Sequence, residues 1–509
     1  MPGRGRRPTR SRAGIVLVGF GALLALLGSE GVTASATPSP AATRTLGVVA
    51  QRQAYAADAR SPVVHDTETN ALVAQDHRLF AATDQWEYPG PRAYGQILVK
   101  NRAGGPWKVF EQTQGLRVEA LDSFPIPTDQ GFGPGRSLLL TQAVLHGRSE
   151  VQWALDGSEA FAATDSYVLS SAGDDVRAFG AHGYGGQWAV YAGVTPTGIL
   201  RGVWSPRAHT LVFNPTPELS VAPGAPGVPA QKVTGFADCA GALYATINTT
   251  LYRRNDGNLP PGVARWVPVY EAPPVGVHNS GLRGITCITE HGSPALLFST
   301  EGSGNVYRLD DLPRGQIDAS GSSSSGAGVV GLDPTLEFSP IPAIRQMLAA
   351  QGTPVPTTGR GSIVYVIAAY NNGAFDGVKV DGVERQPFGF EWGYLGSCPP
   401  TRTCGPVASG IVHFDAEACF AVRTPRSSQQ TYDLRCLAGP DFALSGRVGD
   451  PIRSGQAFVS IRTIVPSPFG DDRLYYGGYD CNFSPADGTA WVASSTFGAL
   501  RLGRPRKES

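Results

Sequence analysis

The chain is poor in charge of either sign. Only 17% of its 509 residues are charged, and 42 Lys and Arg balance 42 Asp and Glu. A net charge of zero excludes bulk binding to nucleic acid, which needs a clear cationic surplus. The 64 glycines and 41 prolines are plentiful instead. Few charges with many Gly and Pro indicate short strands joined by turns rather than long solvated helices.

Familiar catalytic and cofactor motifs are also missing. The sequence has no Gly-x-Ser-x-Gly elbow, no His-Glu-x-x-His and no Cys-x-x-Cys. Residues 131–135 are rich in glycine but lack the Lys-Ser/Thr of a phosphate-binding loop. Residues 480–484 begin like a calcium loop, but Pro485 stands where the turn requires glycine. We therefore expect neither a cofactor nor a metal.

Long apolar runs are absent except at the N-terminus. Residues 13–27 are apolar, five arginines precede them, and Ala34, Ser35 and Ala36 follow as small residues. This pattern is typical of an export signal, which predicts a signal peptide at residues 1–36 and a secreted protein with no membrane span after cleavage. An uncleaved N-terminal anchor is the alternative.

Cysteine is infrequent, with seven residues in the chain. Export to an oxidising compartment favours disulfides over metal ligation. The expected pairs, with Cys481 left over, are Cys239 with Cys287, Cys398 with Cys404, and Cys419 with Cys436.

A repeat of short apolar runs carries the fold prediction. The interval from Val190 to Leu243 is 53 residues, and the interval from Leu243 to Leu296 is 53 again. Each run follows another strand-like segment across a turn, and several precede a third and a fourth. Four antiparallel strands repeated at about 40 to 50 residues are typical of a propeller blade. A stacked sandwich, the alternative, does not predict that the four-strand unit recurs.

The predicted fold is therefore an all-β, single-domain β-propeller of about seven four-stranded blades, with six or eight left open. It occupies residues 76–502 and includes a loop and short-helix insertion at 312–360, the helix at 342–351. Residues 37–75 hold a linker and a ring-closing strand that joins the last blade near residues 491–493. Residues 503–509 are a basic tail. We expect a monomer.

Two turns marked by tryptophan carry a family resemblance. Residues 104–107 read Gly-Gly-Pro-Trp and residues 185–188 read Gly-Gly-Gln-Trp. They resemble the Asp-box turn of sialidase-like propellers but lack its Ser-x-Asp opening, and the resemblance covers these turns alone. The chain as a whole resembles secreted bacterial propellers with tryptophan-marked repeats. The resemblance implies the propeller fold and no particular activity.

Five inner strands are predicted to begin with a basic residue: Arg117, Arg177, Lys232, Arg283 and Arg462. Inner strands converge on the channel of a propeller, so these residues should surround one channel mouth. Such a cluster needs anions to compensate it. The anion could belong to a small molecule or an acidic glycan. The interpretation we favour is an internal collar of ion pairs with Glu119, Asp122, Asp238 and Glu290.

Two functions follow from this pattern. The first is an exported propeller that binds an anionic ligand or partner at the channel mouth. The alternative is a carbohydrate-active enzyme, either a sialidase-like hydrolase or a uronate polysaccharide lyase. Loops after the second strands would supply its catalytic residues, for which the candidates are Asp84, Glu301, Tyr479 and Asp480.

Overall fold

The computed structural model divides the chain into two units, Met1–Thr45 and Leu46–Ser509, and all residues that it describes belong to the second. The described residues are 56–57, 68–84, 95–131, 134–170, 174–221, 231–261, 263–273, 281–317, 331–350, 357–358, 362–368, 378–380, 383–395, 411–412, 418–424, 431–437, 458–480 and 490–496.

Five blades follow one another along the chain as antiparallel sheets. The first is β2 (Glu68–Gln75), β3 (Arg78–Asp84), β4 (Gln96–Lys100) and β5 (Lys108–Gln112), and the second is β6 (Leu121–Pro125), β7 (Ser137–Leu145), β8 (Arg148–Leu155) and β9 (Ser166–Val168). The third is β10 (Asp175–Tyr184), β11 (Gln187–Thr195), β12 (Gly198–Ser205) and β13 (Thr210–Phe213), with β14 (Leu219–Ser220) beside β12. The fourth is β15 (Val233–Cys239), β16 (Ala242–Ile247), β17 (Thr250–Arg254) and β18 (Trp266–Glu271), and the fifth is β19 (Leu282–Glu290), β20 (Ser293–Thr300), β21 (Val306–Leu309) and β22 (Thr335–Phe338). A 3-10 turn, η1 (Thr128–Gln130), lies between β6 and β7.

The C-terminal strands form one connected sheet. They are β23 (Ile363–Ala368), β24 (Val378–Val380), β25 (Val383–Leu395), β26 (Ile411–Val412), β27 (Ala418–Thr424), β28 (Thr431–Leu437), β29 (Phe458–Pro466), β30 (Arg473–Asp480) and β31 (Trp491–Thr496). A pairing between Glu391 and Ser460 joins β25 to β29. With the five blades above, the described part of the chain holds six blades, against about seven predicted with six among the numbers left open.

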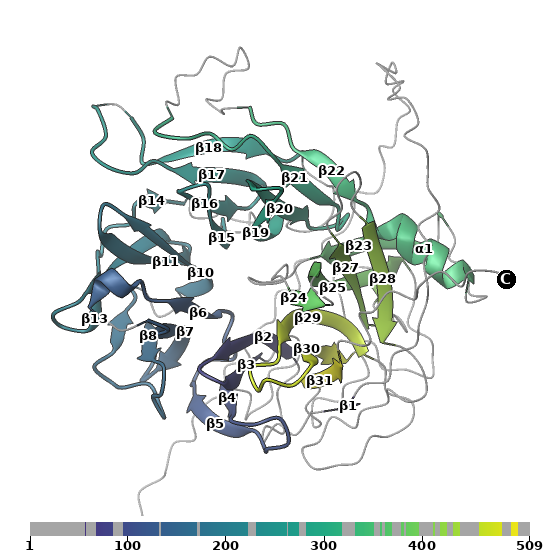
Figure 1. The fold of residues 1–509 in the computed structure, drawn as a ribbon, viewed down its shortest axis with the longest axis horizontal. Helices are drawn as coiled ribbons and strands as arrows, with labels where there is room; N and C mark the ends of the chain where they lie inside the picture. The colour runs from purple at the N-terminus through teal and green to yellow at the C-terminus, as the bar shows by residue number, and fades with distance from the viewer. Residues whose placement is uncertain are drawn as a thin grey trace, which may run out of the picture. The chain divides into compact units, whose positions relative to one another are not determined.

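The blades close into a ring. Contacts between inner strands run from β2 to β6, β10, β15 and β19 in turn, then through β23 and β25 to β29, which lies against β2 (Figure 1). The N-terminal strand β1 (Ala56–Ala57) pairs with β31, with Ala56 opposite Ser494. This strand lies within residues 37–75, where the sequence predicts a closing strand.

Burial of the second strands explains the 53-residue spacing. Val190, Leu243 and Leu296 are fully buried, and each packs into the core that its own blade shares with the preceding blade. The next residues, Tyr191 and Tyr244, pack into the core shared with the following blade. Successive side chains of a strand point to opposite faces, so a blade held between two neighbours needs apolar residues at both. A continuous apolar run results.

Two smaller predictions concern the insertion and the cysteines. Residues Pro340–Ala350 form helix α1, close to the predicted 342–351, and Ile344 packs it into the core between the fifth and sixth blades. A disulfide joins Cys239 of β15 to Cys287 of β19, as predicted. Cys419 and Cys436 are opposite one another in the register of β27 and β28. The pair Cys398 and Cys404, together with Cys481, lies outside the described residues. Within the described part, no helix is long and apolar enough to cross a membrane.

Candidate functional site

The start of the inner strands is irregular in a repeated way. The registers of β2, β10 and β15 each skip one residue, at Asn70, Arg177 and Thr234, and the register of β29 skips two, Val459 and Arg462. The register of β19 likewise contains one extra residue just after Arg283. Such a β-bulge bends its strand and changes the direction of the side chains around it. Two of the five predicted cations are thus bulge residues.

Bulge residues also tie adjacent blades together. The side-chain amide of Asn70 donates to the carbonyl of Glu119 at 3.2 Å, and the hydroxyl of Thr234 donates to the carbonyl of Leu282 at 2.7 Å. Glu119 lies two residues before β6 and Leu282 begins β19, so each acceptor is near the start of the inner strand of the next blade. The same positions therefore hold the blades in register and present side chains at the channel mouth.

The structure brings the five predicted cations into one electrostatic cluster. Glu119 lies between Arg117 and Arg177, and Lys232 is within electrostatic range of Arg177 and Arg283. At the other side of the cluster, Arg117 and Arg462 both act on Asp84. The order of the cations around the mouth therefore follows the order of the blades.

Carboxylates alternate with these cations. Glu119 Oε1 is 2.5 Å from Arg117 Nη1, and Glu119 Oε2 is 2.6 Å from Arg177 Nη1. Asp175 lies 3.3 Å from Arg177 Nε. The remaining two pairs are Arg462 with Glu68, at 3.1 Å, and Arg283 with Glu301. We call these five cations with Glu68, Asp84, Glu119, Asp175 and Glu301 the mouth ring.

Electrostatics within the mouth ring differ from one carboxyl to the next. Burial tends to raise the pKa of Glu119, but Arg177 and Arg117 outweigh it and hold that pKa below its usual value. Burial, with the charge of Glu119 beside it, raises the pKa of Asp175 to about 6. Burial and the nearby charge of Glu68 raise the pKa of Asp84 well above its usual value. The protonated form of Asp84 is therefore favoured more strongly than in an exposed aspartate, although the charges of Arg117 and Arg462 oppose this effect.

Lys232 differs from the other cations of the ring. Among the described residues, no carboxylate forms an ion pair with its ammonium group. Burial lowers the pKa of Lys232, and the charges of Arg177 and Arg283 lower that pKa further, while the more distant charges of Glu119 and Glu301 offset only part of this effect. Its backbone N–H is held by Asn248 Oδ1 at 2.9 Å, which places the residue firmly at the start of β15. The ring therefore has a positive position between the third and fifth blades.

Part of the predicted collar was wrong. Asp238 bonds to His182, and Glu290 bonds to Arg308 and Arg423, because both carboxylates lie toward the far ends of their inner strands. Glu68 and Asp175 were missed. A signal for Asp175 exists: it precedes Arg177 by two residues, a spacing that places both side chains on one face of a strand.

The predicted catalytic residues are distributed as follows. Asp84 and Glu301 belong to the mouth ring. Asp84 is almost fully buried, with 3% of the residue exposed. Tyr479 and Asp480 end β30, where the backbone of Tyr479 is opposite Glu68. The side chains of Tyr479 and Asp480 lie outside the described residues. Nowhere in the described ranges do three His, Cys, Asp or Glu side chains gather as metal ligands would.

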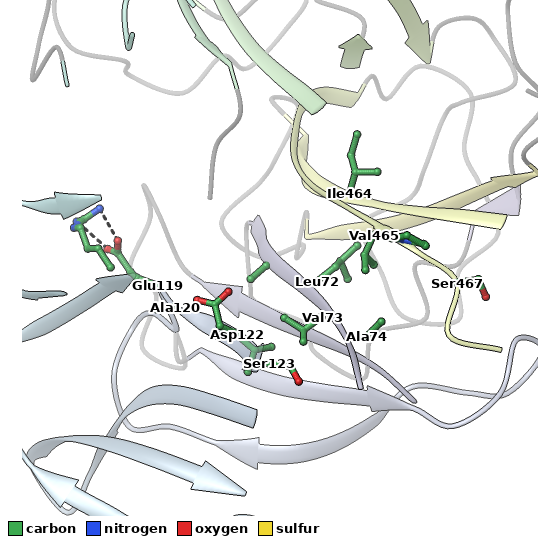
Figure 2. Close-up of a pocket in the computed structure, with 14 residues that line it drawn as sticks. Leu72, Val73, Ala74, Glu119, Ala120, Asp122, Ser123, Ile464, Val465 and Ser467 are labelled. Atoms are coloured by element: carbon green, nitrogen blue, oxygen red, sulfur yellow. Dashed lines mark hydrogen bonds and ion pairs between the residues drawn. The ribbon is translucent and has the colours of Figure 1, made fainter. Parts of the chain in front are cut away.

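A cavity of about 290 Å³ extends from the mouth ring along the channel. Figure 2 shows Glu119 at one end, with its ion pair drawn as dashed lines, and Asp122 and Ser123 further along β6. Leu72 and Val73 of β2 line the same cavity. A small ligand held at the ring would have room beside Arg177 and Glu119.

No protein-family model and no curated protein matches the chain. Solved structures similar to it include the β-propeller domain of Cps50 (Swd1) from Myceliophteria thermophila, which is 12% identical with a TM-score of 0.41 and covers 87% of this chain and 100% of that one. The α-L-arabinofuranosidase Arb93A from Fusarium graminearum is 10% identical with a TM-score of 0.36, covering 89% and 99%. Raptor from Chaetomium thermophilum is 11% identical with a TM-score of 0.40, covering 87% of this chain and 29% of that one. Identities and TM-scores this low carry no argument about function.

Proposed function

We propose that the protein is an exported β-propeller that binds an anionic ligand at its channel mouth, with Lys232 as the central contact. The observation that carries this proposal is the position of Lys232, an ammonium group between two guanidinium groups with no carboxylate of its own among the described residues. Repulsion from like charges weakens the ring at this point, and a bound anion would relieve it.

The charge balance of the ring supports this location. Arg117 and Arg177 share Glu119, and Arg177 also contacts Asp175. Arg283 and Arg462 have Glu301 and Glu68 as partners, while burial and the charge of Glu68 raise the pKa of Asp84 well above its usual value. Four of the five cations thus have an ion-paired carboxylate in the ring. Lys232 is the cation for which the described residues supply no such pair.

Calorimetric titration with inorganic phosphate and sulfate tests the site. Replacing the ammonium group in Lys232→Gln should weaken anion binding by about 10- to 100-fold, since a hydrogen bond to a charged group contributes about 1.5 to 3 kcal/mol. Lys108→Gln is the matched control, because Lys108 is an exposed lysine on β5 of the first blade. Unchanged phosphate binding in Lys232→Gln would refute the proposal.

Export is part of the proposal. The arginine-rich start and apolar run of the first 36 residues support it, and so does the disulfide between Cys239 and Cys287, since disulfides persist in oxidising compartments. Protein recovered from the culture medium should begin after Ala36 when its N-terminus is read by mass spectrometry. A chain that keeps residues 1–36 and stays with the cell membrane would favour the uncleaved anchor.

A carbohydrate-active enzyme is the second candidate. Asp84 favours it, because a carboxyl whose pKa is raised by burial is the kind of group that a glycosidase uses as general acid. Its burial counts against it, since a substrate must reach that proton. Incubation with acidic oligosaccharides distinguishes the two candidates: product formation that Asp84→Asn abolishes would establish the enzyme, and binding without turnover would favour the binding protein.

A further inference from the structure

A second polar cleft lies at the opposite end of the third blade. Tyr184 ends β10 seven residues after Arg177, which corresponds to about 23 Å along a strand. Two cavities of about 280 and 290 Å³ adjoin there and share Tyr184, Gly185 and Gln187 in their walls. We call these two cavities together the Tyr184 cleft. It is remote from the mouth ring.

A network of ion pairs forms the floor of the cleft. His182 Nδ1 is 3.0 Å from Asp238, and His182 Nε2 is 3.1 Å from Asp256. Arg254 contacts both Asp256 and Glu218 and stacks over the ring of Tyr191, 5.3 Å from its centroid. Because nearly every polar group of this floor has a partner, it is rigid and presents a fixed surface to a ligand.

Arg265 adds a cation to the wall without a carboxylate partner. Its Nη1 donates to the carbonyls of Asn255 and Gly257 at 2.7 and 2.9 Å, and no described carboxylate pairs with it. Two backbone acceptors hold the guanidinium in place while leaving its charge uncompensated. A planar guanidinium held in this way is suited to bind a carboxylate with two hydrogen bonds.

Tyr184 provides an aromatic surface between the two cavities. The residue is 53% exposed, which is unusual for a tyrosine ring beside a cavity. Its ring lies against Gly257 of the fourth blade, where the backbone has a φ of +75° and an added Cβ would come within 2.9 Å of Tyr184 Oη. Glycine at this position therefore lets the ring lie close to the neighbouring loop with much of its surface uncovered.

We propose that the Tyr184 cleft binds an acidic oligosaccharide, with a pyranose ring stacked on Tyr184 and a uronate carboxylate bound by Arg265. A tyrosine offers an apolar face together with a polar hydroxyl, which matches the C–H face and the hydroxyls of a sugar. Gln187 and Asn258 supply amide groups to the same cleft. Two cavities on either side of one ring favour an oligomer over a single sugar. This site is independent of the mouth ring.

Calorimetric titration of the purified chain with tetragalacturonate tests the proposal, with cellotetraose as the uncharged probe. Tyr184→Ala should weaken tetragalacturonate binding at least tenfold, and Tyr184→Phe should retain most of it because the ring remains. Arg265→Gln should reduce tetragalacturonate binding to the level of cellotetraose. Leu336→Ala is the control, since Leu336 is an equally exposed residue on the fifth blade.

The other possible results each decide one part of the proposal. No tetragalacturonate binding at millimolar concentration, or binding that Tyr184→Ala leaves unchanged while far-ultraviolet circular dichroism shows intact folding, would overturn the proposal. Equal affinity for cellotetraose would overturn the acidic specificity. Loss of tetragalacturonate binding in Lys232→Gln but not in Tyr184→Ala would place the saccharide at the mouth ring instead. Loss of phosphate binding in Lys232→Gln with unchanged tetragalacturonate binding supports two separate sites.

Discussion

His182 illustrates how a buried group keeps its charge. Its side chain is only 2% exposed, and burial by itself lowers the pKa of an imidazole. Hydrogen bonds to Asp238 and Asp256 outweigh this effect and raise the pKa of His182 to about 9. Arg254 forms an ion pair with Asp256 on the other side of that carboxylate. His182 and Arg254 together lower the pKa of Asp256, which favours its ionised form. His182 is therefore a cation at neutral pH.

This histidine predicts a loss of stability in mild alkali. Because its folded pKa of about 9 lies above the unfolded value of 6.5, its contribution is complete below pH 6.5 and disappears as the pH rises through 9. The full contribution is about 3 kcal/mol. Urea unfolding at pH 6, 7.5 and 9 would measure it. In His182→Gln the free energy of unfolding should vary much less over that range, and an equally steep decline there would contradict the assignment.

Residue patterns predicted the cations of the mouth ring but only some of their partners. Glu119 could be found because it follows Arg117 by two residues in the sequence, just before β6. Glu68 could not be found in this way, because it pairs with Arg462 from the other end of the chain. Asp84 and Glu301 were predicted for their chemistry. Glu301 pairs with Arg283 of its own blade, which the register of β19 and β20 determines, whereas Asp84 meets Arg117 and Arg462 of other blades.

At the scale of elements, the second strands were the most predictable. Burial on both faces forces a continuous apolar run on β11, β16 and β20, so these strands are visible in the sequence. The bulges at Arg177 and Arg462 were not predictable, because an extra residue in a strand is revealed by its pairing partner alone. The pairing of Glu391 in β25 with Ser460 in β29 was not predictable either, because it too is visible only in the strand register.

The disulfide between β15 and β19 should stabilise the fourth and fifth blades against separation. It closes a loop with a sequence separation of 48 residues, for which chain-entropy arguments give about 4 kcal/mol. The double variant Cys239→Ala, Cys287→Ala should lose stability of that order in urea unfolding. Adding a reductant to the natural chain should produce the same shift, while the double variant should not respond to reductant at this bond. A double variant as stable as the oxidised chain would contradict this role.

At the scale of the whole molecule, ring closure depends on a buried ion pair. Arg462 of β29 and Glu68 of β2 have side chains 4% and 3% exposed, and they join the last inner strand to the first. Beside them, the backbone N–H of Leu72 donates to Thr463 Oγ1 at 3.0 Å. Removing Glu68 deprives the buried Arg462 of its ion-pair partner, which is costly even though Asp84 also acts on Arg462.

Glu68→Ala should therefore lower the free energy of unfolding by about 3 to 5 kcal/mol. Asp471→Ala is the matched control, because Asp471 pairs with Arg473 in the same blade at 3.7 Å with both side chains about a third exposed. This control should cost less than about 1 kcal/mol. Thermal unfolding of both variants would measure the difference, and equal losses would mean that the Glu68 pair has no special part in closure.

The contact between Leu72 and Thr463 also determines how late in protein synthesis the ring can close. These residues are 391 positions apart in the chain. At a synthesis rate of roughly 5 to 20 residues per second, the first inner strand waits about 20 to 80 s before its closing partner leaves the ribosome. During that interval the apolar face of the first blade, which includes Leu72 and Leu79, lacks the residues Val465 and Tyr475 that later cover it, and it is available to other nascent chains. A cell that makes this protein must therefore keep its early blades from associating until the last strand arrives.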